Sequence, residues 1–189
     1  MTARKRTVDF GGKCSSQLRR ANWKGVMEKV AVFVDGPQIN GMNKALKDIG
    51  KAIVPRELLY HLLGTRVLHS AKWYQPLKPM DTERADWLYQ YVSLDRLYDL
   101  TTSDEGDIDV ELAVDLVEEA FLGKVDTIVL VSGDGDFLKP IRIAKEQGMR
   151  VEVAGSNKIG DTHMSLFLIR EAHQVVELHD LLGKIAVKV

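Results

Sequence analysis

The stretch VLVSGDGDFLKP, residues 129–140, joins an apolar run to a helical pattern and places two aspartates, Asp134 and Asp136, between them. The apolar run DTIVLVS is short and rich in β-branched residues, which is typical of a strand buried on both faces of a parallel sheet. The next segment, FLKPIRIAKEQG, predicts a helix that ends at Gly148. Two carboxylates at the exit of a buried strand repel each other, so their placement needs an explanation from the rest of the fold.

Strands and helices alternate along the rest of the chain. VAVFVD, residues 30–35, is a second fully apolar strand and is followed by a Gly-Pro pair. Further strands are predicted for residues 65–75, 98–106 and 149–156, and helices for residues 42–50, 55–64, 80–100, 107–123 and 163–172. This alternation predicts an α/β fold with a central parallel sheet between two layers of helices, a three-layer α/β/α sandwich.

Composition places the chain among ordinary globular proteins. Its 189 residues, of which 45% are hydrophobic and 28% charged, suit one domain with its own core. The one cysteine, Cys14, excludes an internal disulfide and a cysteine zinc cluster, which suits a reducing compartment. The sequence contains no apolar run of about 18 residues and no secretory signal at its N-terminus. We therefore expect a cytoplasmic protein with no membrane partner.

Charge is distributed unevenly along the chain. Residues 1–29 contain eight Lys and Arg residues and two acidic residues, a net charge of +6, so the remainder carries −7 within the total of −1. We expect a basic arm over residues 1–28, partly helical or disordered, and a folded domain over residues 29–189. A basic arm attracts a polyanion such as RNA. A solvated tail with no partner explains the same composition equally well.

Four aspartates are expected to meet at one edge of the sheet. In open parallel sheets, binding sites form at the carboxyl ends of the strands, near the point where strand order reverses. The two most apolar strands end at Asp35 and at the pair Asp134 and Asp136. Asp109, near the start of the helix predicted for residues 107–123, shares a face with apolar residues of that helix, so it should point at the end of the sheet.

Such a cluster needs a cation. Two unit charges 4 Å apart repel by about 4 kcal/mol at an effective dielectric constant near 20, and Lys139 is the nearest basic residue in the motif. Clustered oxygen ligands without His or Cys suit Mg²⁺ or Mn²⁺. An ion of this kind activates water and stabilises charge on a phosphoryl oxygen, which is the chemistry of a phosphodiester nuclease.

Each aspartate also has a structural interpretation. Asp35 followed by Gly-Pro suits a turn, and Asp109 suits the first turn of a helix, where the helix dipole favours an acid. Asp136 suits a helix cap. Pro140 argues against that cap. If Asp136 capped the helix, Pro140 would be the fourth helical residue, whose N–H should bond to the carbonyl of the cap, and proline has no N–H. A helix that begins one or two residues later avoids this loss.

Three segments, VAVFVDGP, DIDVELAVD and IVLVSGDGDFLKPIRIAKEQGMRVEVAG, resemble the three sequence blocks of the NYN domain family in this order. More narrowly, they resemble its LabA-like (DUF88) branch, within the PIN-like nuclease superfamily. The resemblance covers most of the chain, from residue 29 to about residue 180. It implies a PIN-like α/β/α sandwich, an acidic site that depends on Mg²⁺ or Mn²⁺, and ribonuclease activity.

The resemblance also assigns candidate residues. By motif it implies catalytic and metal-binding roles for Asp35, Asp109, Asp134 and Asp136. Asp115 matches a recurring aspartate of the family, although helical periodicity places it on a stripe that should face solvent. A second group of candidate site residues consists of Gln38, Asn40, Asp115, Ser132 and Lys139.

Two departures from the family pattern concern the site. The family usually has Asn three residues after the first aspartate, where this chain has Gln38, and Asn40 is the nearest substitute. The family often has a basic residue before the second block, where this chain has the acidic residues Asp104, Glu105 and Asp107. Extra negative charge there would repel a nucleic-acid backbone unless a cation bound first.

The favoured function is a divalent-metal-dependent nuclease with RNA as the favoured substrate, and Lys139 or the basic arm would contact the backbone. The alternative is a non-catalytic module that binds nucleic acid or protein, with stacking on KWYQ, residues 72–75, although core aromatics in a strand explain KWYQ as well. A phosphatase with an aspartyl nucleophile is excluded because Pro37 stands where its second aspartate is needed. The five histidines show no metal-ligand spacing, and a homodimer is left open.

Overall fold

The computed structural model describes residues 27–76, 98–103 and 107–188. Six strands form one sheet in the order β4-β3-β1-β5-β6-β7, and every neighbouring pair is parallel. Their bounds are β1 Lys29–Asp35, β3 Val67–Pro76, β4 Asp99–Ser103, β5 Thr127–Val131, β6 Arg150–Gly155 and β7 Gln174–Glu177. The five strands predicted from the sequence are confirmed, and β7 was not predicted.

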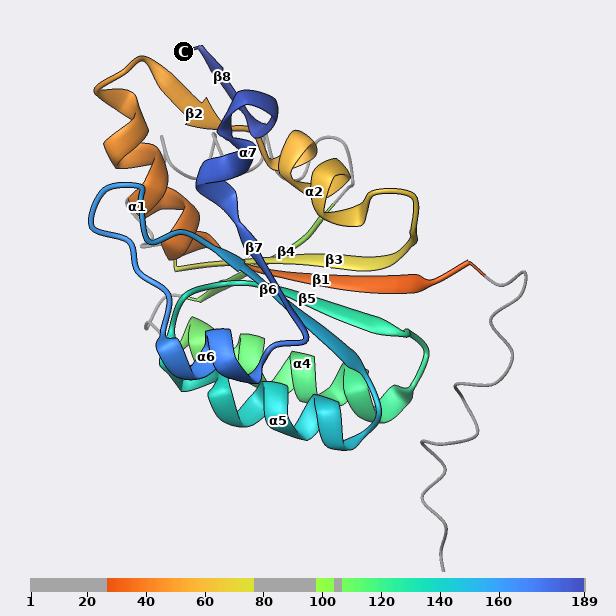
Figure 1. Ribbon diagram of the computed structural model, residues 1–189. Helices are drawn as coiled ribbons and strands as arrows, with labels where there is room; N and C mark the ends of the chain where they lie inside the picture. Colours follow the sequence, from red (N-terminus) through yellow and green to blue (C-terminus); the bar gives the residue numbers. More distant parts are fainter. Residues whose placement is uncertain (1–26, 77–97, 104–106, 189) are drawn as a thin grey trace, which may run out of the picture.

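Helices cover both faces of the sheet (Figure 1). One face carries α4 Ile108–Leu122, α5 Leu138–Glu146 and α6 Leu166–Glu171, and the other carries α1 Gly36–Lys47, α2 Pro55–Leu63 and α7 Leu178–Ile185. Alternate residues of β1 pack into the two cores, Val32 on the α1 side and Phe33 on the α4 side. The protein is therefore a three-layer α/β/α sandwich with a central parallel sheet, as predicted.

Strand order reverses beside β1. From β1 the chain extends the sheet in one direction through β3 and β4, and it then adds β5, β6 and β7 on the other side. The pairing of β1 with β5 runs from Val30 and Thr127 to Val34 and Val131, so the carboxyl ends of these strands are neighbours. Open parallel sheets form their binding crevices at such a switch point.

Helix α1 begins at Gly36, earlier than the start at Met42 that the sequence predicted. Asp35 is its N-cap, and its side chain accepts a hydrogen bond from the backbone N–H of Gln38. Pro37 lies in the first turn, where its missing N–H costs no hydrogen bond. The helix therefore starts directly after β1 and holds the Asp35 carboxylate at the sheet edge.

Two short strands, β2 Lys51–Ile53 and β8 Ala186–Lys188, form a separate antiparallel pair. They were not predicted, because three residues are too few to show the alternation that identifies a strand. Residues 1–26 of the basic arm expected over residues 1–28, and most of the helix expected over residues 80–100, lie outside the described residues. Within the described part of the chain, no helix has the length and hydrophobicity to cross a membrane.

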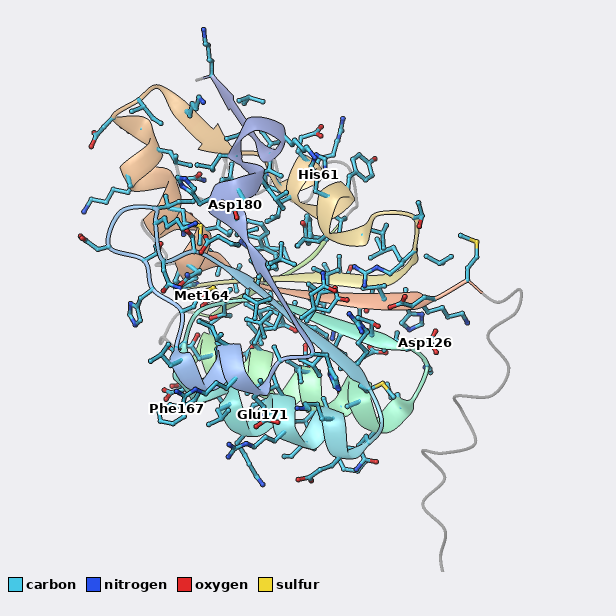
Figure 2. The ribbon with its side chains drawn as sticks, in the orientation of Figure 1. His61, Asp126, Met164, Phe167, Glu171 and Asp180 are labelled. Carbon is cyan, nitrogen blue, oxygen red and sulfur yellow. The ribbon has the colours of Figure 1, made fainter. Side chains whose placement is uncertain are left out.

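Paired charges hold the amino ends of the strands. Glu152 on β6 has a side chain that is 4% exposed, and it accepts hydrogen bonds from Arg66 Nη1 at 3.0 Å and Arg150 Nε at 2.9 Å. Asp126, which Figure 2 labels at this end of the molecule, accepts a hydrogen bond from the backbone N–H of Lys29 at 2.9 Å. Glu152 is thus paired with two basic side chains, whereas the hydrogen bonds to Asp35 among the described residues come from a hydroxyl and a backbone N–H.

Candidate functional site

Asp35 is a buried carboxylate at the end of β1. Its Oδ2 accepts a hydrogen bond from Ser132 Oγ at 2.7 Å, and its Oδ1 accepts one from the Gln38 backbone N–H at 3.3 Å. The residue is only 7% exposed. Burial raises its pKa to about 6, the two hydrogen bonds oppose that rise, and the negative charges of Asp109 and Asp134 add to it. The fold therefore holds this carboxylate in an environment that disfavours its charge.

The segment after β5 forms a tight turn around Ser132. Ser132 Oγ accepts a hydrogen bond from the Asp134 backbone N–H at 3.1 Å, and Asp134 Oδ1 accepts one from the Asp136 backbone N–H at 2.9 Å. A single 3₁₀ turn, η4 Gly135–Phe137, follows, and α5 starts only at Leu138. Asp136 is therefore not the cap of α5, in agreement with the expectation from Pro140.

Asp109 lies in the first turn of α4, as the sequence predicted. Its pKa is raised by burial first, and then by repulsion from Asp134 and Asp136. The side chain does not join the buried face of α4 that packs on the sheet, because the residue as a whole is exposed. It lies instead at the edge of the helix, where it lines two neighbouring cavities.

The first cavity is acidic and has a volume of about 400 Å³. Three of the four predicted aspartates line it, each from a different segment. Its lining residues are Asp35, Pro37, Gln38, Pro76, Ile108, Asp109, Gly133, Asp134, Asp161, Thr162 and His163. Asp136 and Lys139 do not line this cavity and belong to the second one, on the other side of Asp109. The structure thus brings Asp35, Asp109 and Asp134 to one space and places Asp136 beside it.

The candidates Gln38 and Asn40 differ in their surroundings. Gln38 lines the acidic cavity, and its Nε2 is buried without a hydrogen-bond partner among the described residues. Asn40 Nδ2 donates to Gln75 Oε1 at 2.8 Å and is absent from the cavity lining. Gly36 packs closely against the side chain of Gln75. A Cβ at position 36 would lie 2.4 Å from Gln75 Oε1, so only glycine fits there without a shift. Gln38 is therefore part of the cavity lining, whereas Asn40 bonds to Gln75 outside it.

The helical position of Asp115 predicted that it would face solvent, and the structure shows that it does not. Its Oδ2 accepts hydrogen bonds from Lys72 Nζ at 2.8 Å and from the Tyr74 hydroxyl at 2.6 Å. Burial raises the pKa of Asp115, but the bonds from Lys72 and Tyr74 outweigh it and hold the pKa below its usual range. This side chain attaches α4 to β3 and does not line the acidic cavity. The pattern of α4 alone could not show its partners on β3.

After β6 the chain folds back over the end of β5. The Ser165 backbone N–H donates to the Gly133 carbonyl at 2.8 Å, and a Cβ on Gly133 would lie 1.8 Å from the carbonyl oxygen of His163. Met164 is buried at this end of the molecule, opposite the end marked by Asp126 (Figure 2), and its N–H donates to Asn157 Oδ1 at 2.7 Å. The segment is therefore fixed against the site.

Sequence reasoning missed the three residues that this segment adds to the cavity, Asp161, Thr162 and His163. No role was assigned to any histidine, because the histidines lack metal-ligand spacing. The signal that could have found these residues is their position after the carboxyl end of β6, the same rule that selected Asp35 and Asp134. Long connections give no periodic pattern, so the path of this one back to β5 was not predictable.

The donor set of the cavity fits a hydrated divalent cation. In residues 27–76, 98–103 and 107–188, no three His, Cys, Asp or Glu side chains are grouped closely enough to hold a metal ion by themselves. Mg²⁺ does not require such a group, because it keeps several waters and is usually bound by one or two carboxylates. The charges of Asp109 and Asp134 add to the rise in the pKa of Asp35, and the charge of Asp134 adds to the rise in the pKa of Asp109. A cation in this space would relieve that repulsion.

Two known proteins show similarity to this chain. The crystal structure of VPA0982, a protein of unknown function from Vibrio parahaemolyticus RIMD 2210633, superimposes with a TM-score of 0.61 at 24% identity, over 80% of this chain and 93% of that chain. This match concerns the fold alone. The uncharacterized protein MJ0482 of Methanocaldococcus jannaschii is 53% identical over 51 residues, which are 27% of this chain and 21% of that protein. The chain thus matches about a fifth of that relative's length.

The family comparison covers far more of the chain. The match to the NYN domain extends over residues 29–179, which include all six strands of the parallel sheet and every residue that lines the acidic cavity. The order of the strands and the place of the aspartates therefore fall within one continuous match. The chain belongs to the NYN domain family.

Proposed function

We propose that this protein is a divalent-metal-dependent nuclease that hydrolyses phosphodiester bonds in RNA, in the LabA-like branch of its family. The observation that carries the proposal is the acidic cavity, which Asp35, Asp109 and Asp134 line from three separate segments at the switch point of the sheet. Membership of the NYN family and the order of its three motif blocks support the proposal. The single Cys14 suits action in the cytoplasm.

Asp35, Asp109 and Asp134 are the residues that would hold Mg²⁺ or Mn²⁺. Such an ion, when bound, activates water and stabilises negative charge on a phosphoryl oxygen. Asp136 acts from the neighbouring cavity, because its charge already raises the pKa of Asp109 and would draw a cation to the same place. Oxygen ligands of this kind suit Mg²⁺ and Mn²⁺ better than softer metals.

The chain's own residues prepare the site. Hydrogen bonds from Ser132 and from the Gln38 N–H fix both oxygens of Asp35 before a cation arrives. Protons compete with cations for this carboxylate near pH 6, because burial raises its pKa to about 6. His163 lines the same cavity and can donate a hydrogen bond to a phosphate oxygen, whereas the Thr162 hydroxyl donates to the carbonyls of Ile159 and Ser156. Lys139 and the basic arm would contact the nucleic-acid backbone.

One observation favours the alternative of a non-catalytic module that binds nucleic acid or protein. In the described part of the chain no three ligating side chains form a ready-made metal group. A site that binds its cation only weakly can attract RNA through basic residues elsewhere without cleaving it. The nuclease and the binding module would share the fold. They differ in whether a cation and the substrate bind together at Asp134, which cleavage requires.

Cleavage of labelled single-stranded RNA with Mg²⁺ or Mn²⁺, and with neither, tests the proposal. We expect wild-type protein to cleave only with a divalent ion and Asp134→Asn to lose both cleavage and Mn²⁺ binding by calorimetry. Asp48→Asn is the matched control, since it removes an exposed carboxylate at the end of α1, outside the cavity. RNA binding without cleavage of any RNA or DNA by wild type would support the binding module instead.

A further inference from the structure

A second cavity of about 440 Å³ lies between α4 and α5. Its walls are apolar and include Val110, Val114 and Val117 of α4 and Pro140 and Ile143 of α5. Its charged lining residues are Asp109, Asp136 and Lys139. We call this space the α4/α5 groove. Most of its lining is apolar, so a ligand that fills the space must present an apolar surface to Val110, Val114, Val117, Pro140 and Ile143.

The outer face of α4 is unusually apolar for a surface helix. The inner face packs on the sheet through Leu112 and Leu116, which are fully buried. The outer face nevertheless exposes Val110 at 60% and Val114 at 59%. A helix that is apolar on both faces is normally buried on both faces. Contiguous apolar surface that remains exposed marks a binding site. The groove is where this surface is concave.

The groove lies next to the acidic cavity. Asp109 lines both spaces and separates them. Val114 is five residues further along α4, a rise of roughly 7.5 Å along the helix axis, which is on the scale of one extended nucleotide. A polynucleotide with one phosphate in the acidic cavity would therefore place its adjacent nucleotide at the groove.

One of the three charged residues at the groove, Lys139, suits the same ligand, and it lies beside the carboxylates of Asp109 and Asp136. Lys139 is exposed, and none of the ion pairs within the described residues involves it. Its ammonium group is available to a phosphate beside the apolar walls of the groove. A nucleobase has two apolar faces and a phosphate on each side, so it matches both the walls and Lys139.

We propose that the α4/α5 groove holds the nucleobase next to the scissile phosphodiester of a single-stranded polynucleotide, with Lys139 on the flanking phosphate. The inference rests on the proposed nuclease function. A base inside a duplex is stacked and paired and cannot enter, so the groove selects single strands. The Val, Pro and Ile side chains of the groove contact a base without hydrogen bonds, so these contacts do not distinguish the four bases.

Photo-crosslinking tests the site directly. Short single-stranded RNAs with one 4-thiouridine at successive positions are bound to the full chain with Ca²⁺ in place of Mg²⁺, irradiated and mapped by mass spectrometry. We expect crosslinks to peptides that contain Val110, Val114 or Pro140. Crosslinks confined to other parts of the chain would overturn the proposal.

Substitution gives an independent readout. Val114→Glu should weaken single-stranded RNA binding about tenfold, measured by fluorescence anisotropy. Phe121→Glu is the matched control, because Phe121 is 64% exposed on the same helix but does not line the groove. Equal affinity of Val114→Glu and wild type would overturn the proposal.

Two outcomes separate the groove from its rivals. If wild-type protein is a dimer by light scattering and Val114→Glu is a monomer, the groove is an interface between copies and the proposal is wrong. If RNA binds and crosslinks in the groove but no metal supports cleavage, the nuclease function fails while the groove stays a binding site. Loss of cleavage in Val114→Glu with unchanged affinity would also contradict a role in binding the base.

Discussion

Ser132 and Asp35 are 97 positions apart in the sequence, and the hydroxyl of the first donates a hydrogen bond to the carboxylate of the second at 2.7 Å. The same hydroxyl accepts a bond from the Asp134 N–H at 3.1 Å. One fully buried side chain therefore connects the ends of β1 and β5 and orients two of the acidic residues. Neither strand could place its aspartate in this way alone.

Ser132→Ala should raise the pKa of Asp35 above about 6, because the hydrogen bond from Ser132 lowers that pKa against the effect of burial. A ¹³C carboxyl NMR titration measures this without requiring activity. The matched control is Ser70→Ala, since the buried Ser70 hydroxyl has no hydrogen-bond partner among the described residues. An unchanged Asp35 titration in Ser132→Ala would contradict the role given to this hydroxyl.

Asp35→Asn should stabilise the protein at neutral pH. The pKa of Asp35 is raised in the folded state from 3.8 to about 6, so its contribution to stability is fully present below pH 3.8 and is lost as pH rises through 6. Wild-type protein should therefore lose up to about 3 kcal/mol of unfolding free energy between these limits, which Asp35→Asn should retain. Urea unfolding at pH 4 and pH 7.5 measures both.

The control for this pH dependence is Asp48→Asn at the exposed end of α1. Its stability should change with pH as that of the wild type does. Mg²⁺ should stabilise wild type and Asp48→Asn at pH 7.5 but not Asp35→Asn, since a ligand that binds only the folded state raises its stability. Equal stabilisation of all three would mean that the ion does not bind at Asp35.

Gly133→Ala should destabilise the protein by several kcal/mol or displace the segment after β6, because the new Cβ would lie 1.8 Å from the His163 carbonyl oxygen. Gly183→Ala is the opposite case. Gly183 lies within α7, and nothing lies within 4 Å of an added Cβ, so this change should stabilise by about 0.5–1 kcal/mol. Thermal unfolding of both variants measures the contrast, and similar melting temperatures would show that the contact at Gly133 relaxes freely.

Asp115→Asn should destabilise the protein by about 1–2 kcal/mol at pH 7, because it weakens two charge-assisted hydrogen bonds, from Lys72 and Tyr74. The pKa of Asp115 is lowered in the folded state, so this stability is lost as pH falls through that lowered pKa. The difference from wild type should therefore shrink at pH 3. Glu118→Gln, one turn along α4 and exposed, is the control. A double-mutant cycle with Lys72→Met that shows no coupling would contradict this account.

The sequence predicted the parallel sheet because β1 and β5 are continuous apolar runs, which only a strand buried on both faces requires. It also predicted that Asp35, Asp109 and Asp134 would be neighbours, since the rule for carboxyl ends of strands needs only the order of elements. It did not distinguish Asp136 from the other three aspartates, because strand and helix patterns do not show that Asp136 lines the neighbouring cavity with Asp109.

Other features depend on contacts that no local pattern encodes. Asp115 was expected in solvent because the helical period shows which face a residue is on and not which side chains of β3 approach it. His163 was overlooked because its place is set by the backbone contact at Gly133, a consequence of how two connections pack. Both cases are tertiary effects that override local preference.

The bonds of Glu152 to Arg66 and Arg150 lie toward the amino ends of the strands, away from Asp35. Glu152 is level with Val32 in the register, which is three residues before Asp35 and two strands away, a separation of roughly 14 Å, beyond the distance over which substitutions influence one another. Gains in stability made at the Glu152 end should therefore add to losses made at the Asp35 end. The chain can accept new acidic or substrate-specific residues around Asp35 and be compensated at Glu152, so the two edges of one sheet are free to evolve, or to be engineered, separately.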